Sequence, residues 1–500
     1  MSHSQSHPSV NRPKRGMPST HNRSIHRSSI KSHSLTIRLK RELPPTAPMP
    51  ALLQTLACRW IPLGYFEWCR KRYGGRFTTY PIDMTPVVFM SNPEDIHTII
   101  TAPPHILHPG AGVTVLTPLV GEGSFMLQDE DEHIRGRRTI MPPFHHRAVR
   151  NHGETIRSIV EREVESWPFD TAFPVHPHLR ALTLRVVMRT VFGTVFGEAP
   201  PMRALHGAIL DMLAVTEGFV LQQPRLRHLP GWRHTWRTFE RQCLEVDRLI
   251  AAIVHARRTG AGITVLDGLL QAHNPDGSPL SDRQIRDHLM SVLLAGHETT
   301  AAELAWAFQL LAHNPRVQAR LIEEIDADPD ADPDPDVDAD PGPDGNGGAG
   351  AGVGSGGHEY LTATVQEVLR HRPVFLFAIP RVVVEPIEIG GWTYRPPAQL
   401  LGCIYLMHHD PALYPDPHEF RPERFLGAAP SPRVWLPWGG GRKRCPGHHL
   451  ATLEMQTVLR TVLSTRTVQP AAERMERACW RSVIVTPHAG SRIVLRRRGW

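Results

Sequence analysis

The sequence has no apolar run long enough to cross a membrane. A helix that spans the hydrocarbon core needs about 20 consecutive, mostly apolar residues, and the 500 residues contain no such stretch. The nearest candidate, residues 51–66, is shorter and contains Arg59 and Pro62. The short apolar core of a signal peptide is also missing. We therefore predict a protein without a transmembrane segment, located in the cytoplasm.

Cysteine pairs are absent as well. The six cysteines are scattered, with no CxxC pair, and the 30 histidines include no HExxH motif. This distribution argues against a disulfide framework and against a zinc site. It fits a reducing compartment, in which each cysteine has to be considered by itself. The six are Cys58, Cys69, Cys243, Cys403, Cys445 and Cys479.

Two segments lack charges of one sign. Residues 1–41 contain nine Lys and Arg and no acidic residue, and they are poor in apolar side chains, so we predict that 1–43 is a disordered tail. A targeting presequence, a nucleic-acid-binding arm or an over-extended start are the alternatives. Residues 326–357 contain nine Asp and no basic residue, with prolines and then glycines. Proline forbids regular structure and like charges extend the chain, which predicts a surface insertion.

A single cysteine near the C-terminus stands in an unusual loop. From Trp438 to Gly447 the chain reads Trp-Gly-Gly-Gly-Arg-Lys-Arg-Cys-Pro-Gly, and a helical pattern follows. Glycines let the backbone approach a flat ligand closely. Cations and the N-terminus of a helix favour an ionised sulfur, and a lone thiolate is one of the ligands that hold haem iron. The loop therefore indicates that Cys445 is a metal ligand; the alternative is a buried structural cysteine beside a basic patch.

This loop resembles the haem-binding signature of the cytochrome P450 family. Trp438 stands where Phe is commoner, and Lys443 takes a position that is usually Arg or His. By length alone, 500 residues suggest two domains. The resemblance, which covers roughly residues 44–498, instead implies one large domain over 44–500. It implies a mainly α fold with small β-sheets, and haem b between a long central helix and the cysteine loop.

The long helix is predicted over residues 282–313, with Ser281 as its N-cap and Asn314-Pro315 as its stop. Residues 77–90 and 381–394 alternate in the manner of strands, and Gly390-Gly391 suits a hairpin turn. The chain between these segments is mostly helical in pattern.

The middle of the long helix carries Ala-Gly-His-Glu-Thr-Thr, residues 295–300. Burying a carboxyl and a hydroxyl group costs free energy unless both are hydrogen-bonded, so their presence here suggests a functional role. Gly weakens a helix by about 1 kcal/mol relative to Ala. We expect the helix to loosen locally here, as at a π-bulge. The resemblance implies that Ala295 and Gly296 make room over the haem, that Thr299 hydrogen-bonds dioxygen and that Glu298 relays protons. The alternative is a polar stripe in which Thr299 bonds a backbone carbonyl.

Two further sets of residues gain their meaning from the resemblance. His133 and Arg137 share a helix face, and bidentate Arg is a natural partner of a carboxylate. The resemblance implies that they bind a haem propionate, with Arg381 and Lys443 as the other two cations. Glu367, Arg370 and Arg424 are implied to form a buried network that holds the cysteine loop. Such a charged triad requires complete pairing.

Together these features predict a haem-thiolate monooxygenase. It would insert one atom of dioxygen into a small apolar substrate, by hydroxylation or epoxidation. Electrons would come from a separate ferredoxin or flavodoxin with its reductase, because no flavin or iron–sulfur segment follows Cys445. We expect a monomer, with specificity set by residues 105–125 and 201–235 and by the helix face before Ala295. The alternatives are a haem protein of this fold without turnover, such as a sensor or a degenerate paralogue, and a nucleic-acid-binding protein, for which aromatic interleaving is missing.

Overall fold

The structure is a computed structural model that describes residues 43–81, 85–193, 200–216, 229–257, 264–329, 358–427 and 429–498. Residues Pro44–Trp500 form one compact unit. The tail predicted over 1–43 lies outside the described residues except for Leu43, and so does the predicted insertion beyond residue 329. Among the residues that are described, no helix is both long and apolar enough to cross a membrane.

The unit is mainly helical with small sheets, which confirms the predicted fold class. The α-helices are α2 (Ala51–Trp60), α3 (Pro62–Tyr73), α4 (Pro93–Thr101), α5 (Thr117–Val120), α6 (Glu130–Ile140), α7 (His146–Arg150), α8 (Gly153–Glu165), α9 (His176–Phe192), α10 (Pro200–Thr216), α11 (Pro230–Arg257), α12 (Val265–Gln271), α13 (Asp282–His313), α14 (Pro315–Ala327), α15 (Glu359–His371), α16 (Ile404–His408) and α17 (His448–Thr465). Short 3₁₀ helices are η1 (Ala111–Leu116), η2 (Pro142–Phe144), η5 (Pro422–Phe425) and η6 (Gly441–Lys443).

The strands of the described residues form four small sheets. The largest has the order β1-β2-β8-β5-β3, in which β2 and β8 are parallel and the other pairs are antiparallel. The others have the orders β4-β12-β9, β10-β11 and β6-β7. The strands are β1 (Arg76–Thr79), β2 (Val87–Met90), β3 (Leu107–His108), β4 (Ala172–Pro174), β5 (Arg381–Val383), β6 (Ile387–Ile389), β7 (Trp392–Tyr394), β8 (Gln399–Gly402), β9 (Arg466–Pro470), β10 (Ala478–Arg481), β11 (Ile484–Pro487) and β12 (Arg492–Arg497).

The strands predicted from alternation are present. Residues 77–90 give β1 and β2, and residues 381–394 give β5 and the β6–β7 hairpin. Gly390 and Gly391 form the hairpin turn with φ of 58° and 82°, a conformation that glycine adopts without strain. The prediction of the hairpin turn is therefore confirmed.

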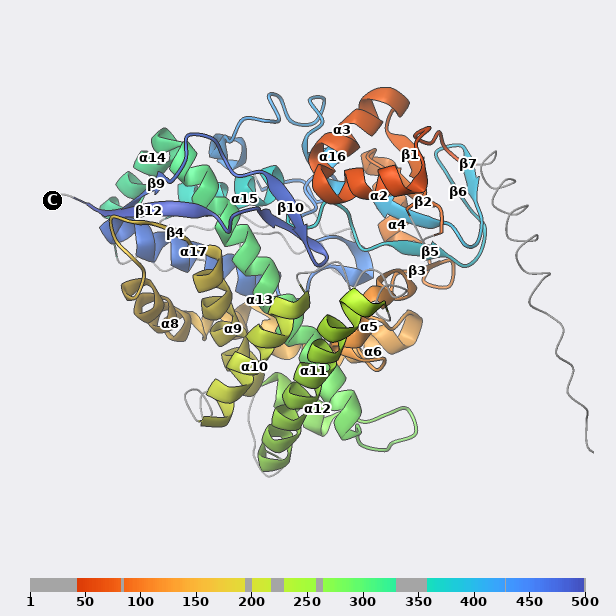
Figure 1. The fold of residues 1–500 in the computed structure, drawn as a ribbon, viewed down its shortest axis with the longest axis horizontal. Coiled ribbons are helices and arrows are strands. Elements are labelled where there is room, and N and C mark those ends of the chain that lie inside the picture. The colour runs from red at the N-terminus through yellow and green to blue at the C-terminus, as the bar shows by residue number, and fades with distance from the viewer. Residues whose placement is uncertain are drawn as a thin grey trace, which may run out of the picture. The chain divides into compact units, whose positions relative to one another are not determined.

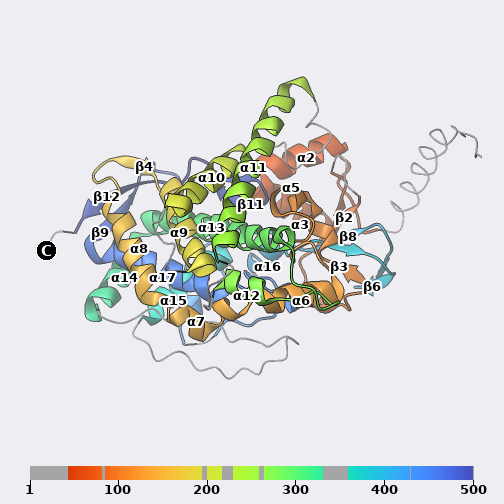
Figure 2. The same cartoon turned by 90° about the horizontal axis from the view of Figure 1, so that it is seen from below.

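Helix α13 runs through the middle of the unit, among α9, α10, α11 and α17 (Figures 1 and 2). It begins and ends where the sequence predicts. Ser281 caps its N-terminus: its hydroxyl accepts a hydrogen bond from the Gln284 N–H at 3.3 Å, and the Gln284 side chain accepts one from the Ser281 N–H at 2.9 Å. Asn314 closes the other end, before Pro315.

The expected loosening of α13 is wrong, because the helix stays α-helical throughout Asp282–His313. Its polar groups find partners without opening the backbone ladder. The Thr299 hydroxyl donates to the Ala295 carbonyl at 2.7 Å, one turn earlier. The Thr183 hydroxyl of α9 donates to the His297 carbonyl at 3.0 Å. Both hydroxyls bond carbonyl groups of a helix that stays α-helical.

Candidate functional site

The cysteine loop is pressed against α4. Gly439 and Gly441 have φ of 66° and 61°, which favours glycine. A Cβ atom on Gly441 would lie 2.2 Å from the carbonyl oxygen of Ile100, so only glycine fits there. The backbone N–H of Cys445 donates to the Trp438 carbonyl at 2.9 Å and closes the loop. The glycines of the signature therefore have a packing role toward α4.

Cys445 itself is half-buried just before α17. Burial raises the pKa of its thiol, and the Gly447 N–H, Arg137 and Arg444 act against that rise. The free thiol is therefore neutral at pH 7, and a bound metal cation is what would favour the thiolate. A Cβ atom on Gly447 would meet nothing within 4 Å, so there is open space beside Gly447, two residues after Cys445.

His133 and Arg137 of α6 both reach the cysteine loop. Arg137 donates to the Arg444 carbonyl at 2.6 Å. The two ring nitrogens of His133 lie 2.9 Å from the Phe125 carbonyl and 3.2 Å from the Arg442 carbonyl. Burial, Lys443 and Arg137 lower the pKa of His133 to about 4, although both carbonyls act to raise it. A neutral ring has only one N–H, so one of these contacts lacks a proton, and a nearby anion would relieve that mismatch.

Lys443, which is half-buried, and Arg381, which is buried, add two more basic side chains. Lys443 donates to the Met126 and Gln128 carbonyls at 3.2 and 2.8 Å, and Arg381 donates to the Ile379 carbonyl at 2.5 Å. Burial lowers the pKa of Lys443 to about 7 and that of Arg381 to about 10. The carboxylate of Asp129 counteracts both shifts.

Asp129 is the one described acidic residue whose charge bears on these two cations, and the sequence analysis did not single it out. Its carboxylate also accepts the backbone N–H groups of Gly110 and Ala111, at 2.6 and 3.0 Å. Positive charge is therefore in excess where α6, β5 and the cysteine loop meet. A group with two carboxylates, such as haem, fits this donor set.

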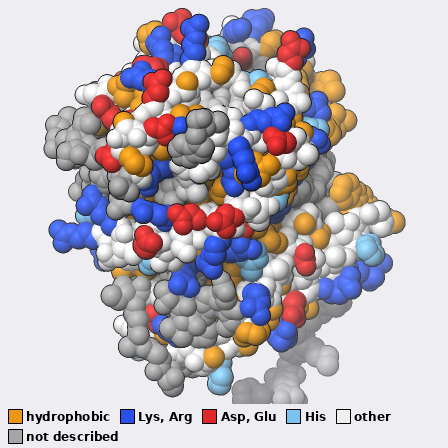
Figure 3. Space-filling model, turned by 90° about the vertical axis from the view of Figure 1, so that its left-hand side faces the viewer, with side chains coloured by type: hydrophobic (Ala, Val, Ile, Leu, Met, Phe, Trp, Pro, Cys, Tyr) orange, Lys and Arg blue, Asp and Glu red, His pale blue; other side chains and the backbone are white. Residues whose placement is uncertain are grey.

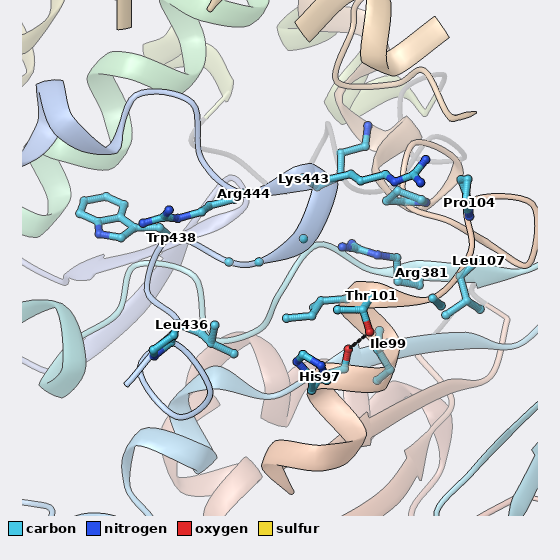
Figure 4. Close-up of a pocket in the computed structure, with 18 of the residues that line it drawn as sticks. His97, Ile99, Thr101, Pro104, Leu107, Arg381, Leu436, Trp438, Lys443 and Arg444 are labelled. Atoms are coloured by element: carbon cyan, nitrogen blue, oxygen red, sulfur yellow. Dashed lines mark hydrogen bonds between the residues drawn. The ribbon is translucent and has the colours of Figure 1, made fainter. Parts of the chain in front are cut away.

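A cavity of about 250 Å³ lies beside these cations (Figure 4). Its walls come from α4, from the start of α6 and from the loop from Pro430 to Arg444, with Trp438, Lys443 and Arg381 among its lining residues. Cys445, Glu298 and Thr299 are not among the residues that line it. The cavity therefore marks the cationic side of the cysteine loop and not the surface of α13.

Residues 295–300 of α13, which include Glu298 and Thr299, are called the acid–alcohol stretch. They lie where this mostly buried helix is partly open to solvent. Ala295 is exposed, and Gly296, Glu298 and Thr299 are half-buried, whereas the helix is buried on both sides of this stretch. A Cβ atom on Gly296 would lie 2.7 Å from Cγ2 of Val187. Gly296 therefore lets α9 approach closely, and the open side of the helix is presented by Ala295.

Glu298 is held by partners that sequence reasoning missed. An Arg180 nitrogen of α9 lies 2.5 Å from its carboxylate, and Nε2 of His297 lies 3.4 Å away. His297, Arg180 and the more distant His176 outweigh burial and lower the pKa of Glu298 to about 2. Glu298 is therefore ionised at neutral pH in this arrangement.

The structure brings Glu367, Arg370 and Arg424 together. Arg370 donates two parallel hydrogen bonds to the Glu367 carboxylate, at 2.6 and 2.8 Å, and both side chains are fully buried. Nε of Arg424 lies 3.4 Å from the same carboxylate. Arg370 also donates to the His408 and Pro417 carbonyls, at 2.7 and 3.0 Å. The network thus joins α15 to the segment that precedes the cysteine loop.

His408, which the sequence analysis does not single out, connects this network to the loop. Its Nδ1 lies 3.3 Å from the Arg370 carbonyl, and its Nε2 accepts the Leu436 N–H at 3.0 Å. The two partners require a neutral ring with the proton on Nδ1. Burial and Arg370 lower the pKa of His408 to about 3, which keeps the ring neutral.

We expect His408→Phe to weaken the hold on the cysteine loop. The buried N–H of Leu436 would lose its acceptor, which costs about 1–3 kcal/mol. The haem-loaded variant should have a lower free energy of unfolding in urea and should lose haem faster to an acceptor protein. His409→Phe is the matched control, because the Nδ1 of His409 bonds the Tyr405 carbonyl one turn earlier and not the loop. Equal haem loss from the two variants would contradict this role.

A long central helix, small sheets and one cysteine in a glycine-rich loop define a haem-thiolate class of protein. The comparisons with known proteins agree. The profile of the family described as Cytochrome P450 matches residues 43–334 and 358–492, and leaves out part of the predicted insertion. The chain therefore belongs to the cytochrome P450 family, and its cofactor is haem b.

Relatives and solved structures support the assignment. The proteins described as cytochrome P450 135B1 and cytochrome P450 138 of Mycobacterium tuberculosis are both 33% identical to this chain. Each match covers 91% of this chain, and 91% and 97% of the two relatives. The structure of a cyanobacterial CYP120A1 with bound retinoic acid matches with a TM-score of 0.76 over 91% of this chain and 99% of that one. At 21% identity, this last likeness shows the fold alone.

Proposed function

We propose that this protein is a haem-thiolate monooxygenase that inserts one atom of dioxygen into a small apolar molecule, by hydroxylation or epoxidation. The observation that carries the proposal is the uncovered acid–alcohol stretch of α13, in a chain that also has the cysteine signature. An apolar substrate fits this setting because Ala295 presents a small apolar surface there. A cytoplasmic, monomeric enzyme remains our expectation.

The proposed roles follow from the contacts of each residue. Cys445 would hold the iron, and His133, Arg137, Arg381 and Lys443 would hold the propionates. When bound, haem supplies the reductive activation of dioxygen. Thr299 would offer its hydroxyl to the reacting oxygen, for which it has to give up its bond to the Ala295 carbonyl. Arg180 would fix where the Glu298 carboxylate lies.

The proposed role of the Thr299 hydroxyl can be tested by its effect on coupling, which is the ratio of product formed to reductant consumed. In Thr299→Ala, the haem should bind normally, because no cation or sulfur is changed. The ratio of product formed to reductant consumed should fall about tenfold or more, with peroxide released instead, because positioned proton donors typically contribute at least that much. Thr300→Ala is the matched control, since Thr300 is buried and its hydroxyl lies 3.4 Å from the Gly296 carbonyl. Unchanged coupling in Thr299→Ala would remove Thr299 from the proposal.

One observation favours a second function, a haem protein of this fold without turnover. Glu298 is tied to Arg180 and has a pKa of about 2, so it holds no proton at neutral pH. Under this alternative, Glu298 forms an ion pair with Arg180 that has only a structural role. Reductant consumption separates the two functions: an oxygenase consumes reductant faster when an apolar substrate shifts its haem spectrum, and a sensor does not.

We propose an acidic ferredoxin or flavodoxin, with its reductase, as the electron donor. Arg442 is exposed on the cysteine loop, and Arg444 is half-buried there. Exposed charges steer association and are screened within about 8 Å at physiological salt. Electron transfer to the protein should therefore slow as salt rises.

Charge reversal provides the test of this surface. Arg442→Glu with Arg444→Glu should slow reduction by the ferredoxin. Because Arg444 also acts on the Cys445 thiol, the haem spectrum is recorded to check that the cysteine loop is intact. Arg233→Glu with Arg237→Glu, at two exposed sites of α11, changes the net charge equally and should leave the rate nearly unchanged. If both double variants behave alike, the donor docks elsewhere.

A further inference from the structure

Helix α13 carries a buried acidic side chain that the proposed mechanism does not use. Acidic side chains usually lie at the surface, and Figure 3 shows Asp and Glu among Lys and Arg on the face that carries β9, β12 and α14. Glu303 is buried instead, in the stretch 301–312, where Gln309 is the one other residue with a charged or amide side chain. The Gln309 amide bonds the Arg492 carbonyl at 3.3 Å and the Glu476 N–H at 3.2 Å. A buried carboxyl group also costs free energy unless it has partners.

Glu303 has one partner, on a distant segment of the chain. Its Oε1 accepts the backbone N–H of Val374 at 2.9 Å, whereas its Oε2 has no hydrogen-bond partner among the described residues. Burial raises the pKa of Glu303 well above its usual range, although the Val374 N–H opposes the rise. The carboxyl group is therefore neutral at pH 7. It accepts the hydrogen bond without placing a charge in the core.

The segment that follows α15 is held at two points. At the first point, the Val374 N–H bonds Glu303 of α13, and the Val374 carbonyl accepts the N–H of Val485 on β11 at 2.9 Å. At the second point, the Leu376 carbonyl accepts the N–H of Tyr405 on α16 at 3.0 Å. Glu303 is the side chain that ties this segment to α13, since the other two bonds run between backbone groups.

The bond to Val374 is made on the face of α13 that carries the acid–alcohol stretch. Ala295, Thr299 and Glu303 are spaced at i, i+4 and i+8 and share this face. Four residues of helix rise about 6 Å, so Glu303 holds Val374 about one turn beyond Thr299. Phe375 comes next, and it is 38% exposed although both of its neighbours in the chain are buried. An apolar ring is therefore kept close to the part of α13 that is open to solvent.

We propose that Glu303 is a positioning residue for substrate selection. By holding Val374, its neutral carboxyl group keeps the Phe375 ring as a fixed apolar wall beside the acid–alcohol stretch, where the ring limits the shape of the molecule that reaches Thr299. This inference rests on the proposed oxygenase function, because it concerns the substrate of that reaction. A carboxyl group with only a structural role would affect all ligands alike, so selectivity between ligands is the property to measure.

Two substitutions test whether Glu303 holds Val374. Glu303→Gln keeps an oxygen that can accept the Val374 N–H, whereas Glu303→Leu removes it at a similar size. Hydrogen exchange at Val374 in the haem-loaded protein should become about tenfold faster or more in the Leu variant alone, because a buried N–H without an acceptor is destabilised. Both variants should lose an infrared C=O band of a neutral carboxylic acid. The matched control is Glu454→Leu, which removes another buried carboxyl group, on α17, that has no hydrogen-bond partner among the described residues.

Selectivity is measured as the ratio of the dissociation constants of a steroid and a straight-chain fatty acid, each obtained from its shift of the haem spectrum. Glu303→Leu should change this ratio about tenfold in favour of the bulky steroid, and Glu303→Gln should leave it nearly unchanged. Phe375→Ala should cause the same change, and Glu303→Leu should add nothing when residue 375 is already Ala. Haem content and thermal unfolding check each variant. If Glu303→Leu loses haem, Glu303→Met replaces it, since Met also lacks an acceptor and adapts to irregular space.

Three results would overturn the proposal. Unchanged hydrogen exchange at Val374 in Glu303→Leu would show that the carboxyl group does not hold the segment. An equal change of the ratio in Glu303→Leu and Glu454→Leu would reduce Glu303 to a general contribution to stability. Additive effects of Glu303→Leu and Phe375→Ala would show that Glu303 does not act through that ring. None of these measurements needs turnover, so the predicted selectivity without any oxygenated product would contradict the proposed function and leave this role of Glu303 intact.

Discussion

Cys445→Ser is expected to lose the reduced, carbon-monoxide-bound spectrum that is characteristic of haem-thiolate proteins, and with it all turnover. Serine is a far weaker donor to haem iron than a thiolate. The fold should persist, because the contacts that close the loop run through the Cys445 backbone N–H and through Arg137, which the substitution leaves in place.

Cys479→Ser is the matched control for this substitution. Cys479 is a half-buried thiol on β10, at 3.9 Å from the Thr486 hydroxyl, and serine can take over that contact. The control should keep the thiolate spectrum. If Cys445→Ser keeps it too, another residue is the ligand and the cysteine loop has been misread.

Arg370→Ala should be the most destabilising single substitution that we consider. It would strand the fully buried Glu367 carboxylate, which keeps only Arg424 and the Arg421 N–H at 3.4 and 2.9 Å. Breaking a buried pair by removing one partner costs about 3–5 kcal/mol. Because stabilities are commonly about 5–15 kcal/mol, we expect little soluble, haem-loaded protein.

The chain offers a closely matched control on its surface. Arg248 and Glu245 have the same i, i+3 spacing and the same two-pronged geometry, at 2.6 and 2.8 Å, but both side chains are largely exposed. Arg248→Ala should leave the unfolding transition where it is, since exposed pairs contribute little. A similar loss of stability in both variants would show that burial does not determine how much the Glu367–Arg370 pair contributes to stability. The measurement is the midpoint of thermal unfolding, together with the yield of haem-loaded protein.

Much of the fold could be predicted from local patterns. The bounds of α13 followed from Ser281 and Asn314-Pro315, because caps and stops are properties of a few neighbouring residues. The β6–β7 turn followed from two glycines for the same reason. The pairing of Glu367 with Arg370 was visible as an i, i+3 spacing, and only the family resemblance distinguished it from a surface pair such as Glu245 and Arg248.

The partners of the candidate site residues could not be predicted in this way. Arg180 and Glu298 are 118 positions apart, and only the packing of α9 on α13 brings them together. Asp129 and His408 also act through contacts between distant segments, and no spacing rule covers such contacts. The expected loosening of α13 failed for a related reason: Gly296 lets Val187 of α9 pack closely on the helix, a contact that a one-dimensional pattern does not reveal.

The central claim is that this chain transfers one atom of dioxygen to an apolar molecule. A spectral-shift screen of fatty acids, terpenes, steroids and aromatics first selects a compound that binds near the haem. That compound is then incubated with the haem-loaded protein, reductant, a ferredoxin with its reductase and dioxygen labelled with ¹⁸O. The account predicts product that carries one labelled oxygen atom, with the second atom in water, and no such product from Cys445→Ser. Reductant consumption without labelled product from any compound that shifts the spectrum would contradict it.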